Sequence, residues 1–112
     1  WNMVLPPGGR STWGWKQNSM VVVDPDKGTV RYTPEFYVMK HYSHFISPGA
    51  VRLGLAGQWA GNAVCFSNPD GSMVLVVANP FEEKRELAFA HPGGILSANL
   101  PGQSFNTFVI SL

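Results

Sequence analysis

Three of the four tryptophans in this chain lie within its first fifteen residues, at positions 1, 13 and 15. They stand among Gly, Pro, Ser and Asn, a composition typical of loops. Tryptophan offers a wide flat face and one N–H donor, so tryptophans beside amides and hydroxyls suit a site for a ring-shaped ligand, above all a sugar. One interpretation is that Trp1, Asn2, Trp13 and Trp15 line a carbohydrate subsite. The alternative is that Trp13 and Trp15 anchor the loop onto the body of the protein.

The acidic residues do not form a pair suited to glycoside hydrolysis, which needs two carboxyl groups about 5–10 Å apart. Glu82 and Glu83 are adjacent, so on a strand they would point to opposite faces. Two basic residues follow them, and this stretch predicts an exposed hairpin tip. Glu35 is placed to favour the start of a helix. The remaining candidates lie in turn sequences, where short carboxylates accept bonds from nearby backbone N–H groups: Asp24, Asp26 and Asp70. No residue of this chain is therefore predicted to be catalytic.

Two histidines, His41 and His44, form a His-x-x-His motif on a predicted helix, where this spacing places both rings near one face. The sequence offers no third ligand in a matching position, so we expect a packed or solvent-lining aromatic face and predict no metal and no cofactor. Cys65 lies in an apolar run and is expected to be a small core residue, because no paired base supports a reactive thiol.

The overall composition is that of one folded domain, with 45% hydrophobic and 12% aromatic residues in 112 positions. Charged residues make up only 13%, roughly half of the usual share. Such a surface either meets neutral ligands or is buried against a partner. The net charge of +1 comes with no basic stripe, so nucleic acid is not an expected partner. No apolar run approaches the roughly 20 residues of a membrane span.

The first half of the chain predicts a strand, a long loop, a hairpin and a helix. Residues 1–5 are expected to form a buried strand end, and the loop 6–18 carries Trp13 and Trp15. A turn rich in Asp, Pro and Gly separates two short strands near 20–23 and 29–32. Thr33 is expected to cap a helix that runs from Pro34 to Ile46 and carries an apolar stripe.

In the second half, hydrophobic residues alternate with a period of two, which is typical of strands. Continuous apolar residues at 73–77 predict a strand that is buried on both faces. Trp59 is expected to cap a sandwich edge. The predicted fold is mainly β, an antiparallel β-sandwich preceded by one strand, a long loop, a hairpin and one helix. The predicted strands of the sandwich cover 51–55, 62–67, 73–77, 86–90, 95–98 and 104–110.

Five stretches resemble glycoside hydrolase family 30, which includes glucosylceramidases and bacterial β-1,6-glucanases: WNMVL, STWGWKQNSMVVVD, TPEFYVMKHYSHFISPGAVRLGL, NPDGSMVLVVANP and LPGQSFNTFVI. The resemblance runs through essentially all 112 residues in order. That family is built from a (β/α)₈ barrel and a side β-sandwich. The resemblance implies that residues 1–47 are the last strand, loop and helix of the barrel, and that residues 48–112 form the C-terminal sandwich.

The resemblance also implies a substrate site. The tryptophan that matches Trp1 lines the sugar pocket, and an asparagine of the loop approaches it, for which Asn18 is the candidate. Family members often carry an acidic or amide residue where this chain has Pro6 and Pro7, so the pocket should differ in shape there. The acid/base and nucleophile glutamates belong to earlier barrel strands. The implied parent is a retaining β-glycosidase for a β-linked glucan or glucoside, expected to be secreted or periplasmic, and this chain alone should hydrolyse nothing.

The expected protein partner follows from the same reasoning. A lone barrel strand and helix would expose apolar faces, so we expect the chain to pair with the remainder of the barrel or with another copy of itself. Two rival hypotheses stay open. The chain could be a free-standing carbohydrate-binding β-sandwich module, or a purely structural sandwich with buried tryptophans.

Overall fold

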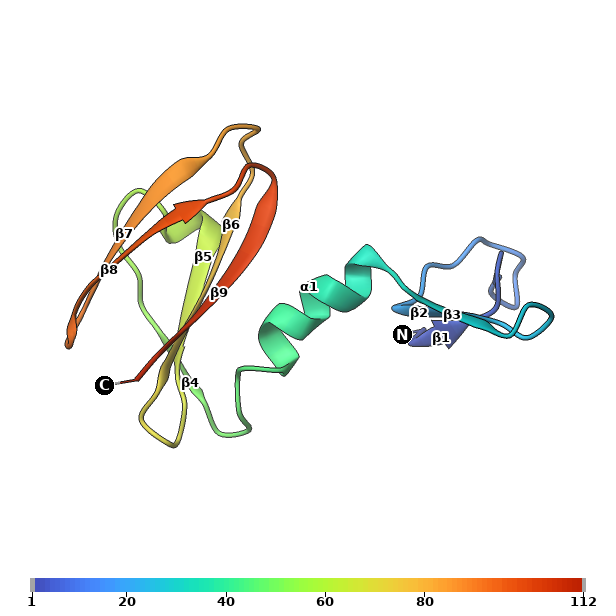
Figure 1. The fold of residues 1–112 in the computed structure, drawn as a ribbon. Coiled ribbons are helices and arrows are strands. Elements are labelled where there is room, and N and C mark those ends of the chain that lie inside the picture. Colours follow the sequence, from blue (N-terminus) through green and yellow to red (C-terminus); the bar gives the residue numbers. More distant parts are fainter. Residues whose placement is uncertain (1, 112) are drawn as a thin grey trace. The chain divides into compact units, whose positions relative to one another are not determined.

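The computed structural model describes residues 2–111, and its contacts divide the chain into two compact units, residues 1–40 and 41–112. The first unit is built on a three-stranded sheet with the order β1-β2-β3 (Figure 1). Strand β1 (Val4–Leu5) pairs in parallel with β2 (Val21–Asp24). Strand β2 pairs in antiparallel fashion with β3 (Thr29–Tyr32), which confirms the predicted hairpin.

The turn of this hairpin is stabilised by a short carboxylate that accepts hydrogen bonds from nearby backbone N–H groups, as its residue types predicted. The Oδ1 atom of Asp24 accepts hydrogen bonds from the backbone N–H groups of Asp26, at 3.1 Å, and Lys27, at 3.2 Å. Gly28 follows with a φ of +61°, a conformation that costs glycine little. Asp24 is therefore a turn residue, as predicted.

The strand β1 is shorter and more exposed than the sequence predicted. Only Val4 and Leu5 join the sheet, and the side chains of Met3 and Val4 are 66% and 55% exposed. The expectation of a buried strand over residues 1–5 is wrong for these positions. Among the described residues β1 pairs with β2 alone, so its other backbone edge has no paired strand.

The helix α1 (Pro34–Ser43) begins where predicted, with Pro34 at its first position and Glu35 in its first turn. The Thr33 hydroxyl, however, does not cap it. That hydroxyl shares its single hydrogen between the carbonyl oxygens of Ser19, at 2.7 Å, and Met20, at 3.0 Å, so it ties the start of the helix to the end of the long loop. The predicted side-chain cap is replaced by a tertiary contact.

The helix also ends earlier than the predicted Ile46. The Asn68 amide donates to the carbonyl of Phe45 at 3.0 Å and accepts from the N–H of Ser47 at 3.0 Å. Asn68 thus holds the backbone of residues 45 and 47, which lie just beyond the end of the helix at Ser43.

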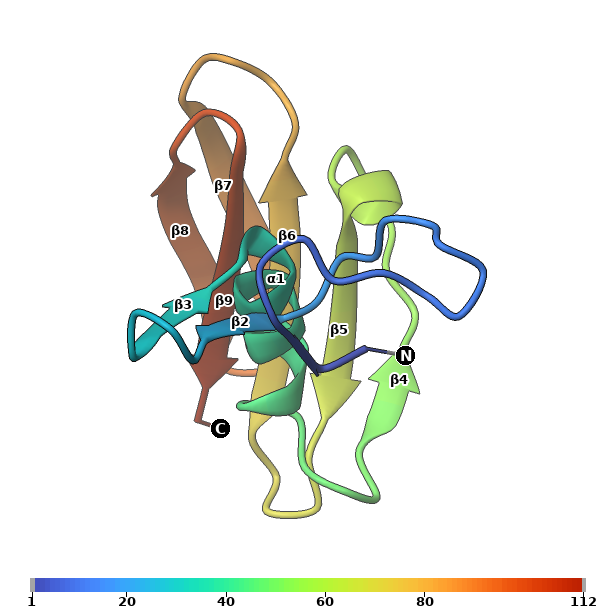
Figure 2. The same ribbon diagram turned by 90° about the vertical axis from the view of Figure 1, so that its right-hand side faces the viewer.

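The second unit contains two β-layers, and Figure 2 shows strands β4, β5 and β6 running side by side. One layer is an antiparallel sheet of four strands in the order β4-β5-β6-β9, and the other is the hairpin β7-β8. A short 3-10 helix, Ala60–Asn62, precedes β5. The strands are β4 (Val51–Leu53), β5 (Ala63–Ser67), β6 (Met73–Asn79), β7 (Arg85–His91), β8 (Gly94–Leu100) and β9 (Ser104–Ile110).

A shared hydrophobic core joins the two layers, which confirms the sandwich. Its buried side chains come from both sheets: Cys65, Met73, Leu75, Val77, Leu87 and Leu100. Strand β6 is buried on both faces from Met73 to Val77, as its continuous apolar run predicted. Cys65 is a core residue, and burial raises the pKa of its thiol above the ordinary value, which disfavours the reactive thiolate.

The predicted hairpin tip around Glu82 and Glu83 is wrong in its connectivity. These residues are exposed, but they cross from β6 in one sheet to β7 in the other, because β6 pairs with β5 and β9. A second crossing, from β8 to β9, packs closely on the first. A Cβ atom added to Gly102 would overlap the carbonyl oxygen of Glu82, so only glycine fits there.

Candidate functional site

The loop that carries Trp13 and Trp15 is closed by hydrogen bonds across its base. Arg10 and Lys16 form an antiparallel bridge, and the N–H of Ser11 donates to the carbonyl of Trp15 at 2.9 Å. The Arg10 guanidinium donates to the carbonyl of Gly14 at 2.7 Å. Gly14 has a φ of +82°, which lets the chain reverse direction between the two tryptophans. Local contacts therefore give this loop a defined shape.

The two tryptophans at the end of this loop are exposed. Trp13 is 77% and Trp15 is 67% exposed, and their ring centroids lie 5.9 Å apart with the ring planes tilted by 35°. Within the described residues they do not anchor the loop onto the body of the protein, so that alternative is wrong. Two adjacent aromatic faces are thus open to a ligand, a combination that suits the flat, apolar side of a sugar ring.

The Asn2 side chain lies against a residue of the same loop. Its Nδ2 atom donates a hydrogen bond of 2.8 Å to Oε1 of Gln17, and both side chains are half-buried. The backbone N–H of Gln17 in turn donates to the carbonyl of Gly9 at 3.1 Å. These bonds fix two amide side chains, which can both donate to and accept from sugar hydroxyls.

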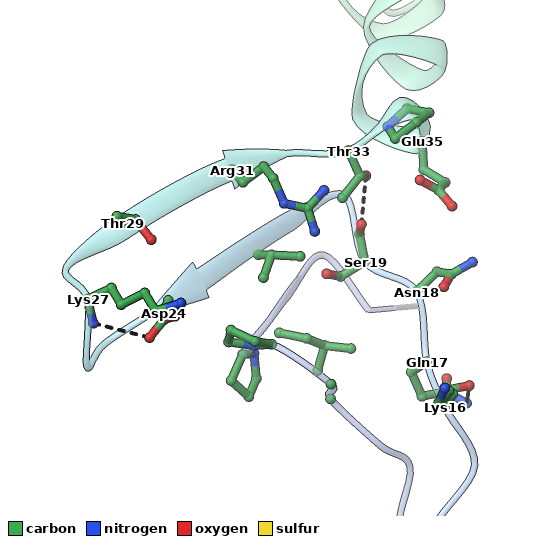
Figure 3. Close-up of a pocket in the computed structure, with 17 residues that line it drawn as sticks. Lys16, Gln17, Asn18, Ser19, Asp24, Lys27, Thr29, Arg31, Thr33 and Glu35 are labelled. Atoms are coloured by element: carbon green, nitrogen blue, oxygen red, sulfur yellow. Dashed lines mark hydrogen bonds and ion pairs between the residues drawn. The ribbon is translucent and has the colours of Figure 1, made fainter.

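A cavity of about 650 Å³ lies beside both flanks of the loop (Figure 3). The close-up shows Gln17 and Asn18 on one side and Arg31 reaching into it from β3. Apolar residues, polar residues and five charged residues contribute to its walls. The full lining is Leu5, Pro6, Pro7, Gly8, Gly9, Lys16, Gln17, Asn18, Ser19, Val22, Asp24, Lys27, Thr29, Arg31, Thr33, Pro34 and Glu35.

The charges around this cavity are mixed in sign. Three cations, Lys16, Lys27 and Arg31, face two carboxylates, Asp24 and Glu35. Asp24 is already engaged by its own turn and lies 3.9 Å from the Lys27 ammonium. A cavity with nearly balanced charge and many hydrogen-bonding groups is better matched to a neutral polyhydroxy ligand than to a strongly charged one.

Other chemistries find little support in residues 2–111. No group of three His, Cys, Asp or Glu side chains there is arranged to hold a metal ion. The two histidines of the His-x-x-His motif engage different neighbours. His41 Nδ1 lies 2.8 Å from the hydroxyl of Thr107, whereas the ring of His44 packs edge-on against Phe45.

Trp59 donates its indole N–H to the carbonyl of Glu86 at 3.1 Å, at the edge of β7.

The structure brings only some of the predicted site residues together. Trp1 lies outside the described residues. Trp13 and Trp15 lie together, Asn2 lies against the loop, and Asn18 lines the cavity. Sequence reasoning missed Gln17, because an amide in a polar loop gives no sign of a partner fifteen residues away.

Comparison with known proteins identifies the family of this fold. Residues 49–108 match the glycosyl hydrolase family 30 beta sandwich domain. The match covers more than half of the sequence, and the chain belongs to glycosyl hydrolase family 30. This agrees with the resemblance found in the sequence motifs.

Individual relatives agree with this assignment. The chain is 34% identical to the lysosomal acid glucosylceramidase of Mus musculus over 113 aligned positions, which cover 97% of the chain and 22% of that protein. It is 28% identical to the endo-1,6-beta-D-glucanase neg1 of Aspergillus fumigatus, covering 80% of the chain and 20% of that enzyme. The crystal structure of SrfJ from Salmonella typhimurium superposes with a TM-score of 0.88 at 26% identity, covering 97% of the chain and 25% of SrfJ.

The chain thus spans about a fifth of the length of the curated relatives it matches. No helix within residues 2–111 is long and apolar enough to cross a membrane.

Proposed function

We propose that this chain is the C-terminal part of a retaining β-glycosidase, and that it supplies a wall of the substrate pocket and a supporting β-sandwich. In this proposal residues 1–47 belong to the (β/α)₈ barrel and residues 48–112 form the side sandwich. The substrate is a β-linked glucan or glucoside. The catalytic carboxylates lie on other parts of the enzyme, because the acids of this chain lie in turns, in exposed connections, at the start of a helix and, for Glu86, at an exposed position of β7.

The exposed pair Trp13 and Trp15 carries the proposal. Exposing two large aromatic rings leaves apolar surface in water, so their position at the end of a hydrogen-bonded loop favours a role in binding. The same loop has the polar cavity on its flanks and the Asn2 amide at its base. Aromatic faces and amides on one loop and at its base are the groups expected of a sugar-binding wall.

The test uses the complete enzyme that contains this chain. Replacing Trp13 or Trp15 with Ala should raise the KM for 4-nitrophenyl β-glucoside about two- to tenfold, because an aromatic contact is worth about 0.5–1.5 kcal/mol. The matched control is Phe81→Ala, which removes a 47% exposed aromatic ring from the sandwich unit and should leave KM unchanged. Unchanged kinetics in both tryptophan variants would exclude the proposed wall.

The exposed tryptophans also suit the rival hypothesis of a free-standing carbohydrate-binding module. Titration of β-glucan oligomers into the 112-residue chain separates the two. Micromolar binding that is lost in Trp13→Ala would favour the module. Weak or absent binding by the chain, together with the KM effects in the complete enzyme, would favour the pocket wall.

A further inference from the structure

The two amides of Asn2 and Gln17 form a chain of hydrogen bonds that starts at the backbone. The Gln17 side chain donates through Nε2 to the carbonyl oxygen of Lys16, in a long bond of 3.4 Å. Its Oε1 atom accepts from Nδ2 of Asn2 at 2.8 Å. Because the Gln17 N–H also bonds to Gly9, Gln17 is held at both its backbone and its side chain.

This chain of bonds selects one orientation for each amide. A carboxamide has a donor end and an acceptor end, whereas a backbone carbonyl can only accept. In the structure Gln17 turns its NH₂ group toward Lys16 and its oxygen toward Asn2. Asn2 must then turn its own NH₂ group toward Gln17, which leaves its Oδ1 atom facing elsewhere.

The Oδ1 atom of Asn2 is open to a ligand. It makes no hydrogen bond within residues 2–111, where Asn2 bonds through Nδ2 alone. Asn2 is only half-buried in the structure, so part of its surface meets solvent. An accessible acceptor of fixed orientation can recognise a hydroxyl, which donates, and discriminates against groups that only accept.

We propose that Gln17 is a positioning residue of the substrate site, and that it holds Asn2 so that Oδ1 accepts a hydrogen bond from a sugar hydroxyl. This inference rests on the proposed function. It adds that, in one contact, the substrate donates the hydrogen bond and Asn2 accepts it. Gln17 acts through Asn2 and does not itself touch the reacting atoms.

The central variant is Gln17→Leu in the complete enzyme. Without Gln17 the Asn2 amide can rotate and present its NH₂ end, so the KM for 4-nitrophenyl β-glucoside should rise about three- to tenfold, the value of one hydrogen bond. The kcat should change less than about twofold, because the contact is made in the ground state and the transition state alike. The matched control is Gln58→Leu, since Gln58 is an exposed residue of the sandwich unit.

A second substitution separates positioning from packing. In the Gln17→Leu background, Asn2→Asp makes both terminal atoms of residue 2 acceptors, so its orientation no longer matters. The KM should then return to within about twofold of the original value. A purely structural role of Gln17 would not be rescued in this way. Gln17→Glu alone keeps an acceptor toward Asn2, so it should retain KM even where Gln17→Leu fails to fold.

Three outcomes would overturn the inference: an unchanged KM in a folded Gln17→Leu enzyme, no rescue by Asn2→Asp, or a raised KM in Gln17→Glu. The proposed function fails separately, when Trp13→Ala and Trp15→Ala both leave KM unchanged. A raised KM in Asn2→Ala with an unchanged KM in Gln17→Leu would remove the positioning role and leave the pocket wall intact.

Discussion

At the scale of single residues, Asn79 shows how one buried amide holds irregular backbone in place. Its side chain is 1% exposed, and the two hydrogens of its Nδ2 atom are shared among the carbonyls of Glu83, Leu100 and Pro101, which lie 2.8–3.1 Å from the nitrogen. Its Oδ1 atom accepts from the N–H of Phe81 at 3.1 Å. Backbone that leaves a sheet has lost its regular partners, and Asn79 supplies them for both crossings between the sheets.

Asn79→Ala should therefore be strongly destabilising. It would remove these four hydrogen bonds from buried and partly buried backbone, and we expect a loss of about 2–4 kcal/mol in the free energy of unfolding. Urea unfolding followed by circular dichroism measures this loss. Asn99→Ala is the control, because Asn99 is exposed on β8 and its removal should cost no more than about 0.5 kcal/mol. Equal stability of the two variants would contradict this account.

At the scale of elements, the turn between β5 and β6 combines two side chains with different tasks. Asn68 joins the end of α1 to the turn, and Asp70 shapes the turn itself. The Asp70 carboxylate accepts from the Ser72 hydroxyl at 2.7 Å and from the Ser72 N–H at 2.9 Å. The Ser72 hydroxyl, followed by its N–H, lowers the pKa of Asp70 below the ordinary 3.8.

This lowered pKa predicts how the turn responds to acid. A carboxylate with a depressed pKa in the folded state contributes stability above its ordinary pKa and loses it as the pH falls through the lower value. Asp70→Ala should therefore lower the Tm at about pH 6. The difference in Tm between this variant and the unaltered protein should shrink at about pH 2.5. Asp26→Ala, in the exposed turn of the first unit, is the control. A Tm difference that stayed constant with pH would contradict the assigned role of Asp70.

At the scale of the whole molecule, the first unit exposes many apolar side chains. Besides Trp13 and Trp15 of the loop, seven of them are more than a third exposed and belong to β1, β3, α1 and the residue before β1. They are Met3, Val4, Val30, Tyr32, Tyr37, Val38 and Met39. Exposed apolar surface of this extent is typical of an interface, which agrees with the expected pairing with the remainder of a barrel or with another copy.

We therefore expect the isolated chain to self-associate, with a solution mass above the 12.3 kDa of one copy. Light scattering after size exclusion measures this mass. The double variant Val30→Lys and Tyr32→Lys should shift the chain toward the monomer by placing charge on the exposed face of β3. Ile95→Lys, at a 71% exposed position of the second unit, is the control and should leave the mass unchanged. A well-behaved monomer of the unaltered chain would count against the expected partner.

Much of the secondary structure could be predicted from the sequence because its signals are local. The Asp24 turn, the start of the helix at Pro34 and the buried run of β6 each depend on residue types within a few positions. Motifs spread along the whole chain also identified the family, which the match over residues 49–108 confirms. Local sterics and hydrogen bonding act in the same way wherever these segments lie in the fold.

Contacts between distant segments were decided by the tertiary structure alone. The hydroxyl of Thr33 bonds to the end of the long loop, Asn68 bonds to the backbone that follows the helix, and the segment after β6 crosses between sheets. The pairing of Asn2 with Gln17 and the exposure of the tryptophans belong to the same group. A side chain bonds to whatever the folded chain brings near it, and residue type alone does not specify that neighbour. The sequence therefore determined the kinds of groups available to the site, and the fold determined which of them meet.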